Sequence, residues 1–489
     1  MASSSFVRIT VLIWADILTA YALFVMMPYL TNVWKLNFTH AAAIVNVFSG
    51  VATIMPIGMA FLVDAFMGDY WMLLLSSLAY SFGLSFLAMS TPHVLQNAAR
   101  NCDAHKPDCI GDAQKVLFYT ALVLIAIGIS GHITSLESFL EQQKENQASA
   151  QENSEKPMPR QVAGSLFVVL LAIVGCIALP YIKPWFVRFG IPAICTVVAT
   201  FIFTTGSCSY RSSRPPGSPL TTLCRVFVAS ASKTFRHLPP NDIQEPYTRS
   251  LRCLDKAAID FQTQNQEQIE QSRWKLCTRE EVEDTKMVIR MIPMWMTFIM
   301  CGVVISIGNT YFLDQANDMN RKVGELKVPL PIFKFFYDLV KDKFHKKYVK
   351  LTEKLMIPGR YVPPLGIFVA MLFSILCCIT AAGVETRRLD MIRRHLLLEE
   401  PNDSNEKIPM SMFWLLPQFL LLGAVEGMAN FSIDQFFINQ APASMSRYLK
   451  LFRHGVIGAG AVGSVLSVYV VGKFSERGGR TNWFSGHTE

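Results

Sequence analysis

The sequence predicts an all-α membrane protein with about eleven membrane-spanning helices in two bundles. Three observations indicate this class. Of the 489 residues, 51% are hydrophobic and only 17% are charged, whereas soluble domains contain roughly 25% charged residues. Apolar stretches close to the ~20 residues that cross a bilayer recur along most of the chain. Lysine and arginine gather in a few connecting segments, as expected for loops at a membrane surface.

The first bundle is predicted at residues 1–206, with spans near 8–30, 42–63, 70–90, 116–136, 163–183 and 187–206. A polar segment follows at 207–288, which we interpret as a cytoplasmic linker. The second bundle is predicted at 289–474, with spans near 289–312, 329–345, 365–384, 413–434 and 455–473, before a polar tail at 475–489. Because the bilayer core offers the backbone no hydrogen bonds, each span must be a helix. The second bundle therefore lacks one span relative to the first.

The segment 329–345 is the weakest of these spans, because it contains Lys334, Asp338 and Lys341. It is either an interfacial helix or a poorly apolar span. Eleven lysines and arginines lie between Arg321 and Arg360, and a crossing helix moves part of them to the cytoplasmic side that basic loops prefer. A crossing also places the arginines near residue 390 outside. Neither topology therefore puts every basic segment on the cytoplasmic side. We favour the crossing.

The linker is not of low complexity. An amphipathic helix is predicted around 220–235, and a charged helix is predicted to run directly into the span that begins near 289. The simplest interpretation of the whole segment is a solvated connector between the bundles.

Several classes of function find no support in the sequence. The eleven cysteines include no CxxC pair and no zinc spacing, so we predict no metal and no cofactor. Neither a nucleophile elbow nor a phosphate-binding loop is present, and no paired carboxylates accompany a histidine, so we predict that the protein is not an enzyme. The net charge of +8 follows loop topology, and we expect no nucleic-acid partner.

Six sequence blocks resemble a known family. They are MAFLVDAFMGDYW (59–71), TALVLIAIGISGH (120–132), YRSSRPPGSPLTTLCRVFVAS (210–230), LRCLDKAAI (251–259), LCTREEVEDTKMVIRMIPMW (276–295) and FWLLPQFLLLGAVEGMANFSIDQFFINQAPASM (413–445). In this order, and across both halves, they are similar to the proton-coupled oligopeptide transporters of the major facilitator superfamily. The closest branch is the plant nitrate and peptide transporter family. The GSPL and LDKAA blocks are the most specific.

The resemblance implies the major facilitator fold, with two six-helix bundles, the last helix being absent here. It also implies inverted repeats and a substrate site between the bundles near mid-membrane. Transport then proceeds by alternating access. Substrates in the family include nitrate, small peptides, hormones and specialised metabolites.

Ionisable residues inside a span are costly and are therefore functional candidates. The family carries a Glu-x-x-Glu-Arg motif in its first span, which couples a proton to the substrate. The matching positions here are Asp16, Thr19 and Ala20. We take Asp16, Thr19 and the nearby Tyr21 as candidates for substrate binding or coupling, with snorkelling to the cytoplasmic face as the alternative for Asp16.

The fourth span offers a second candidate for coupling. The family carries a lysine there, and the matching position is Ile133, directly after His132. His132 is a candidate because histidine titrates near neutral pH. The alternative is a packed, hydrogen-bonded histidine with a structural role.

The span at 413–434 and the residues after it hold three further candidates. The family glutamate before Phe-Phe is Gln435 here, beside Asp434. Glu426 lies about two turns earlier, close to the face of Asp434. Since Glu426 is in the middle of the span, snorkelling explains it least well, and we expect it to face the central cavity.

Three gating candidates lie at the cytoplasmic ends of helices. Asp64 and Gly68 belong to the tight turn between the second and third spans, which braces the gate in this superfamily. The arginine expected after the glycine is Asp69 here, which puts the usual gate lock in question. Arg290 begins the seventh span, where it serves either in the gate or as a membrane anchor.

These residues predict a secondary-active or facilitative transporter of a small solute such as nitrate, a peptide or another small metabolite. Proton coupling needs groups whose protonation changes substrate affinity between states, and the losses at Thr19, Ala20, Ile133 and Gln435 predict weakened coupling. The alternative is a non-transporting or truncated paralogue with a regulatory role. We expect a monomer in the plasma or vacuolar membrane, with a small-molecule or anion substrate and protons as an open second partner.

Overall fold

The computed structural model describes most of the chain. The described residues are 2–91, 111–148, 167, 170, 173–175, 177–210, 217–234, 251–258, 277–398 and 408–475. Eight stretches of these residues are long and apolar enough to cross a membrane, and the described residues are mostly helical, as predicted. The predicted span at 163–183 lies partly outside the described residues, and each of its described residues up to Tyr181 is helical.

The first half contains six described helices. They are α1 (Ala2–Phe24), α2 (Met26–Asn32), α3 (Phe38–Leu62), α4 (Gly68–Met89), α6 (Asp112–Ala148) and α8 (Trp185–Thr204). The chain breaks at Val25, between α1 and α2, because Pro28 has no N–H to continue the helical ladder back to Phe24. A π-helical turn, η1 (Val63–Met67), joins α3 to α4, so the predicted second and third spans form one bent stretch of 52 residues, Phe38–Met89.

The second half contains five described helices. They are α11 (Arg279–Asp318), α12 (Ile332–Lys354), α13 (Val362–Leu398), α14 (Leu416–Gln440) and α15 (Ser446–Ser475). A capping box of Thr278 and Glu281 starts α11, ten residues before the predicted span, so the expected charged helix does run into the membrane. Two small strand pairs lie between the helices, β1 (Met319–Asn320) with β4 (Ile408–Ser411) and β2 (Lys322–Val323) with β3 (Leu326–Lys327).

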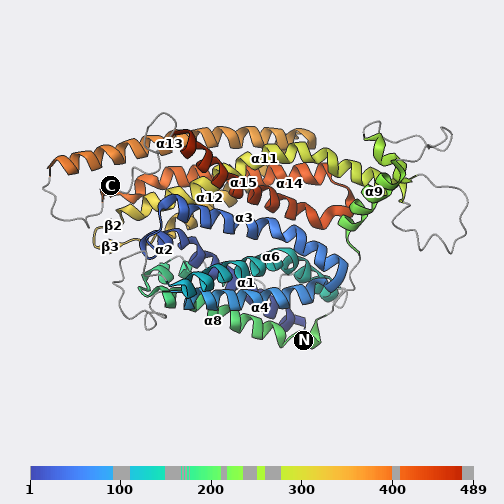
Figure 1. Cartoon of the computed structure of the whole chain (residues 1–489), viewed down its shortest axis with the longest axis horizontal. Helices are drawn as coiled ribbons and strands as arrows, with labels where there is room; N and C mark the ends of the chain where they lie inside the picture. The colour runs from blue at the N-terminus through green and yellow to red at the C-terminus, as the bar shows by residue number, and fades with distance from the viewer. Residues whose placement is uncertain are drawn as a thin grey trace, which may run out of the picture.

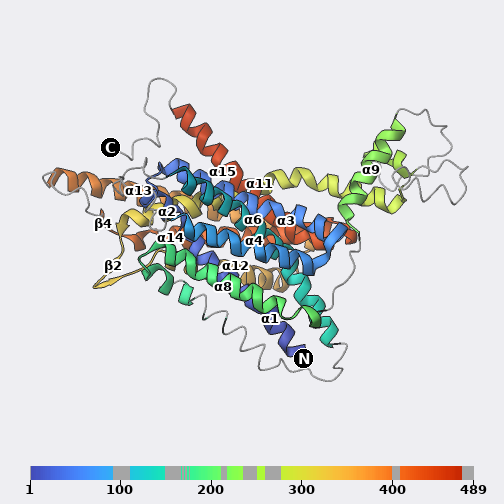
Figure 2. The ribbon, with the colours of Figure 1, turned by 60° about the horizontal axis from the view of Figure 1, so that its bottom comes forward.

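The two ends of the molecule differ, and Figure 1 shows both. We call the end that carries α9 (Pro219–Thr234) the linker end, and the end that carries α2 and the β2–β3 hairpin the far end. The helices run between these two ends in two side-by-side groups (Figures 1 and 2). At the far end, apolar side chains of both halves form one core, including Met27, Tyr29, Leu313 and Phe333.

Small residues let the two halves approach each other. A Cβ atom at Gly458 of α15 would lie 2.8 Å from the carbonyl oxygen of Gly50 on α3, and one at Gly460 would lie 2.5 Å from Gly302 of α11. Glycines at such contacts allow backbones to pack closely inside a membrane. The interface between α3 and α15 therefore depends on residues that lack a side chain.

The weak eighth span is a longer helix than predicted. The sequence predicted an end near residue 345, whereas α12 continues to Lys354, because residues 346–354 are mostly good helix formers and Pro358 lies just beyond. Its charges keep it out of the eight membrane-length apolar stretches. It lies against α14 along its length, and the crossing stays a prediction.

The two halves are not equally covered. In the first half, α8 packs against α1 and α4. Among the described helices of the second half, none takes the matching place beside α11 and α13, and apolar side chains there are exposed: Met296 is 65%, Phe368 61% and Ile379 63% accessible. The number of spans in the second half stays a prediction.

The linker has a small core of its own. Helix α9 and the 3-10 helix η6 (Arg252–Ala258) pack on the first turns of α11 around Val226, Leu254 and Val282. The Lys286 ammonium is fully buried there, 2.5 Å from Asp255 and 2.9 Å from Glu283. A purely solvated connector is thus the wrong description of these described linker residues.

Candidate functional site

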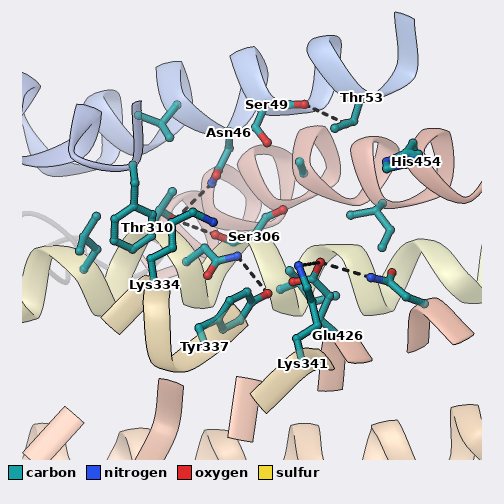
Figure 3. Close-up of a pocket in the computed structure, with 18 of the residues that line it drawn as sticks. Asn46, Ser49, Thr53, Ser306, Thr310, Lys334, Tyr337, Lys341, Glu426 and His454 are labelled. Carbon is teal, nitrogen blue, oxygen red and sulfur yellow. Dashed lines mark hydrogen bonds and ion pairs between the residues drawn. The ribbon is translucent and has the colours of Figure 1, made fainter. Parts of the chain in front are cut away.

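A cavity of about 560 Å³ lies between the two halves. Its lining comes from the α1–α2 break, α3, α11, α12, α14 and α15 (Figure 3). Pockets of this size, largely apolar with a few polar groups, are typical of small-molecule sites. The cavity is therefore the first candidate for a substrate site.

Helix α12 supplies two lysines to this cavity. Lys334 and Lys341 are seven residues apart, so they project from the same face of the helix two turns apart. Asp338 lies between them, 3.0 Å from the Lys334 ammonium and 3.4 Å from that of Lys341. The Lys334 ammonium also lies 5.8 Å from the ring centres of Tyr21 and Phe24 in the other half. The lysines of α12 therefore place positive charge on the side of the cavity that faces the first half.

Helix α14 places a carboxylate opposite Lys341. The Glu426 carboxylate lies 3.6 Å from the Lys341 ammonium and accepts a 3.3 Å hydrogen bond from the Asn430 amide. The close approach has a cause in the sequence. A Cβ atom at Gly427 would lie 2.5 Å from the carbonyl oxygen of Lys341, and one at Gly423 would lie 2.7 Å from that of Tyr337. Two glycines of α14 thus let α12 bring its lysine to the glutamate.

The first half lines the cavity with neutral polar groups. The Asn46 amide of α3 donates to the Thr310 hydroxyl at 3.4 Å and to the Ser464 hydroxyl at 3.1 Å, which joins three helices of both halves. Ser49 and Thr53 follow on the same face of α3. Among the described lining residues, all charged groups come from the second half.

The three candidates predicted around α14 have different surroundings. Glu426 lines the cavity, as expected. Asp434 pairs with Arg453 of α15, a residue that also lines the cavity. Gln435 is half-buried and is not a lining residue.

Two candidates of the first half meet each other. The Nδ1 atom of His132 lies 2.9 Å from the Asp16 carboxylate, and its Nε2 atom lies 2.9 Å from the Ser77 hydroxyl. His132 is only 5% accessible. The sequence indicated each residue separately and did not predict their contact. Neither lines the cavity, so a role in coupling stays a prediction.

The other two candidates of α1 are buried. The Thr19 hydroxyl donates to the Ala15 carbonyl of its own helix at 2.9 Å, which is a local contact. Tyr21 is 6% accessible and faces the Lys334 ammonium. Tyr21 is therefore the candidate of this helix that reaches the second half.

An ionic contact closes the linker end. Arg447 at the start of α15 pairs with Asp64 at 3.0 Å and also with Asp69. Gly68 has φ 71°, a left-handed value that favours glycine, and it lets the chain turn so that both aspartates face the other half. Asp69, which replaces the expected arginine, therefore shares Arg447 with Asp64. Arg290 is exposed on α11, and its role in the gate stays a prediction.

Sequence reasoning missed several residues of this site. In the sequence, Lys334 and Lys341 only weaken a predicted span, and the family motifs do not indicate Arg447, Arg453 or Asn46. Once α12 is accepted as a span, the rule that intramembrane charges are functional candidates identifies its lysines. No local signal in the sequence identifies Arg447, because its partners lie more than 370 residues away.

Comparisons with known proteins agree with this geometry. The family model PTR2, described as the POT family, matches residues 70–484. The chain is 42% identical over 491 residues to Protein NRT1/ PTR FAMILY 5.5 of Arabidopsis thaliana, covering 97% of this chain and 89% of that protein. It is 31% identical over 487 residues to Protein NRT1/ PTR FAMILY 5.6 of the same plant, covering 94% and 81%.

Solved structures show the same fold. An auto-inhibited POT family peptide transporter superposes with a TM-score of 0.66 at 17% identity, covering 95% of this chain and 88% of that chain. A POT family transporter in complex with 5-aminolevulinic acid gives a TM-score of 0.60 at 11% identity, covering 96% and 90%. These likenesses confirm the predicted helical fold of the major facilitator type.

Proposed function

The chain belongs to the POT family of membrane transporters of small solutes, in its plant NRT1/PTR branch, and from this premise we propose that the cavity between its halves is the substrate site of an alternating-access cycle. The observation that carries the proposal is the charged face of α12 and α14. Lys334, Lys341 and Glu426 line the cavity between the two halves. A polar solute needs such groups to replace its water.

The two ends are built to open separately. The linker end is held by the ion pairs of Arg447 with Asp64 and Asp69. The far end is held by neutral contacts, including the reciprocal 3.2 Å hydrogen bonds of Asn32 and Asn317, and by the apolar core. Because different contacts close the two ends, one can break while the other holds, as alternating access requires.

We propose that proton coupling is weak in this carrier. The second carboxylate and the arginine of the family motif are replaced by Thr19 and Ala20, and the Thr19 hydroxyl donates to the Ala15 carbonyl of its own helix. The Asp16–His132 pair is the titratable group that remains in this region. It lies outside the cavity lining, so a change in its charge acts on the substrate only through packing.

Uptake measurements test the proposal. Labelled nitrate and a labelled dipeptide are offered to oocytes that express the chain at the surface, at about pH 5.5 and about pH 7.5, on either side of the ordinary histidine pKa. We expect uptake of one solute, with rates at the two pH values within about twofold, and loss of uptake in E426Q. Strong stimulation by acid would contradict weak coupling. Equal uptake by E426Q and the parent chain would contradict the cavity as the site.

A further inference from the structure

A second pocket, of about 330 Å³, lies at the far end of the molecule. The first half contributes the turn before α8 and the start of that helix, and the second half contributes the segment from the end of α11 to the start of α12. No described residue lines both this pocket and the central cavity. We call it the far-end pocket.

The far-end pocket is rich in positive charge. Four of its lining side chains are cations, two from each half, and none of the described lining residues is acidic: Lys183, Arg188, Arg321 and Lys327. Outside the lining, the charge of Asp318 acts on Arg321. Cations from two surfaces that meet in this way repel each other unless an anion lies between them.

Arg188 is held rigidly at the rim of this pocket. One of its terminal nitrogens donates to the carbonyls of Pro180 and Ile182 at 2.9 and 2.8 Å. Its guanidinium lies 4.1 Å from the ring centre of Trp185. The Nε atom is buried and has no hydrogen-bond partner among the described residues.

Arg321 has the same arrangement in the other half. Its Nη2 atom donates to the Asn317 side chain at 2.9 Å, and Asn317 is paired with Asn32 of the first half. Its Nε atom is again buried without a partner in the described part of the chain. Burial lowers the pKa of Arg321, and Asp318 opposes this shift. Two anchored guanidinium groups thus each keep one buried donor unused.

We propose that the far-end pocket binds a small planar oxyanion, either a carboxylate group or nitrate. Guanidinium groups bind such anions through charge-assisted hydrogen bonds. An arginine from each half lines the pocket, and the exposed Lys183 and Lys327 ammonium groups add long-range attraction. The bound anion joins the two halves and holds the far end closed.

The β2–β3 hairpin links anion binding in this pocket to closure of the far end. The Val328 N–H donates to the Arg321 carbonyl at 2.9 Å, which closes the base of the hairpin. The Tyr181 hydroxyl of the first half donates to the Lys327 carbonyl at 2.8 Å. An anion that neutralises the cations on both sides therefore stabilises the hairpin against the first half.

Calorimetric titration of the purified full-length chain in nanodiscs tests the site without requiring transport. Sodium acetate represents a carboxylate and sodium nitrate the free inorganic ion, each at fixed ionic strength. We expect R321Q to weaken binding of the preferred anion by about tenfold or more, because a charge-assisted hydrogen bond is lost. The exposed double change K183Q/K327Q, which leaves the anchored arginines in place, should weaken it about threefold to tenfold. The anion that binds more tightly identifies the source.

Two control variants locate the effect. Arg387 also lies on a tryptophan, 3.9 Å from the ring centre of Trp414, but outside the pocket, so R387Q should bind the anion as the parent chain does. K341Q removes a cation of the central cavity and tests whether the measured binding belongs to that cavity instead. Binding that survives R321Q but is lost in K341Q places the anion in the central cavity and overturns the proposal.

Amide hydrogen exchange measures the closure directly. The preferred anion should slow exchange in residues 322–328 of the parent chain and of R387Q, since local opening limits exchange. R321Q should show no such slowing. Anion binding that leaves the exchange of this hairpin unchanged would refute the clamp between the halves.

Discussion

Lys341 and Glu426 show how charged side chains are stabilised in the cavity of a membrane protein. Their side chains are 30% and 16% accessible, so both are largely removed from water, and each lowers the cost of burying the other. Asp338 contacts both lysines of α12, which keeps them apart and oriented. Lys341 and Glu426 can each exchange the ionic partner within the protein for a charged group of a solute.

Removing one member of this pair should destabilise the protein more than removing both. K341M leaves the Glu426 carboxylate without its nearest cation, and we expect a loss of roughly 1–3 kcal/mol in the free energy of unfolding. K341M/E426Q should recover much of that loss while abolishing uptake. Thermal unfolding in detergent measures stability, and oocyte uptake measures transport. A double variant less stable than K341M would show that the pair is not coupled.

The Asp16–His132 contact gives a second prediction at this scale. D16N keeps the shape of the side chain and removes the negative charge that lies 2.9 Å from the Nδ1 atom of His132. We expect uptake at neutral pH to change less than about threefold, because neither residue lines the cavity. If D16N abolishes uptake while the protein still reaches the surface, the pair belongs to the coupling machinery.

At the scale of elements, the fit between α12 and α14 depends on two glycines. Gly427 and Gly423 leave room for the backbone of α12 at Lys341 and Tyr337. Helix α12 is too charged to be held in the membrane by its own hydropathy, so this contact, together with the stacked rings of Phe333 and Phe419, keeps it in place. The position of the cavity lysines follows from this packing.

The variant G427A should displace α12. A methyl group 2.5 Å from the Lys341 carbonyl oxygen forces the helices apart, at a cost of roughly 1–3 kcal/mol, and we expect a lower melting temperature and reduced uptake. The matched control is G383A on α13, where a Cβ atom meets nothing within 4 Å. That change should be neutral or stabilising by up to about 1 kcal/mol. Equal effects of the two variants would mean that the α12–α14 contact is not tight.

The elements divide into those that local sequence determines and those that packing determines. Hydropathy predicted the apolar spans, and the turn at Asp64 and Gly68 followed from its sequence block. The extent of α12 and its role were poorly predicted, because hydropathy penalises the same lysines that the cavity uses. Tertiary packing brings Asp16 to His132 and Arg447 to two aspartates. A single sequence carries no local signal for such contacts.

At the scale of the whole molecule, different types of contact close the two ends. Charge pairs close the linker end, where Gly217 of the linker also donates from its N–H to the Asp64 carbonyl at 3.0 Å. Apolar packing and neutral hydrogen bonds close the far end.

Loss of the linker-end lock should shift the balance between the ends. R447Q removes both ion pairs of the gate, and we expect thiol reagents to reach the cavity from the linker side more readily, with slower net uptake. The control is K450Q, which breaks the pair of Lys450 with Glu137. Both of those side chains are 60% accessible, so the pair contributes at most about 1 kcal/mol. Similar accessibility in R447Q and K450Q would argue against Arg447 as the lock.

The most direct test of alternating access through this cavity is a reversible tether across the far end. N32C/N317C places cysteines where two amides now share hydrogen bonds of 3.2 Å, and a short bis-methanethiosulfonate reagent can join them. We predict that the reagent stops uptake in the double variant but not in N32C or N317C alone, and that reducing agent restores it. Full uptake by the tethered protein would contradict the account, because the solute would then cross without separation of the halves.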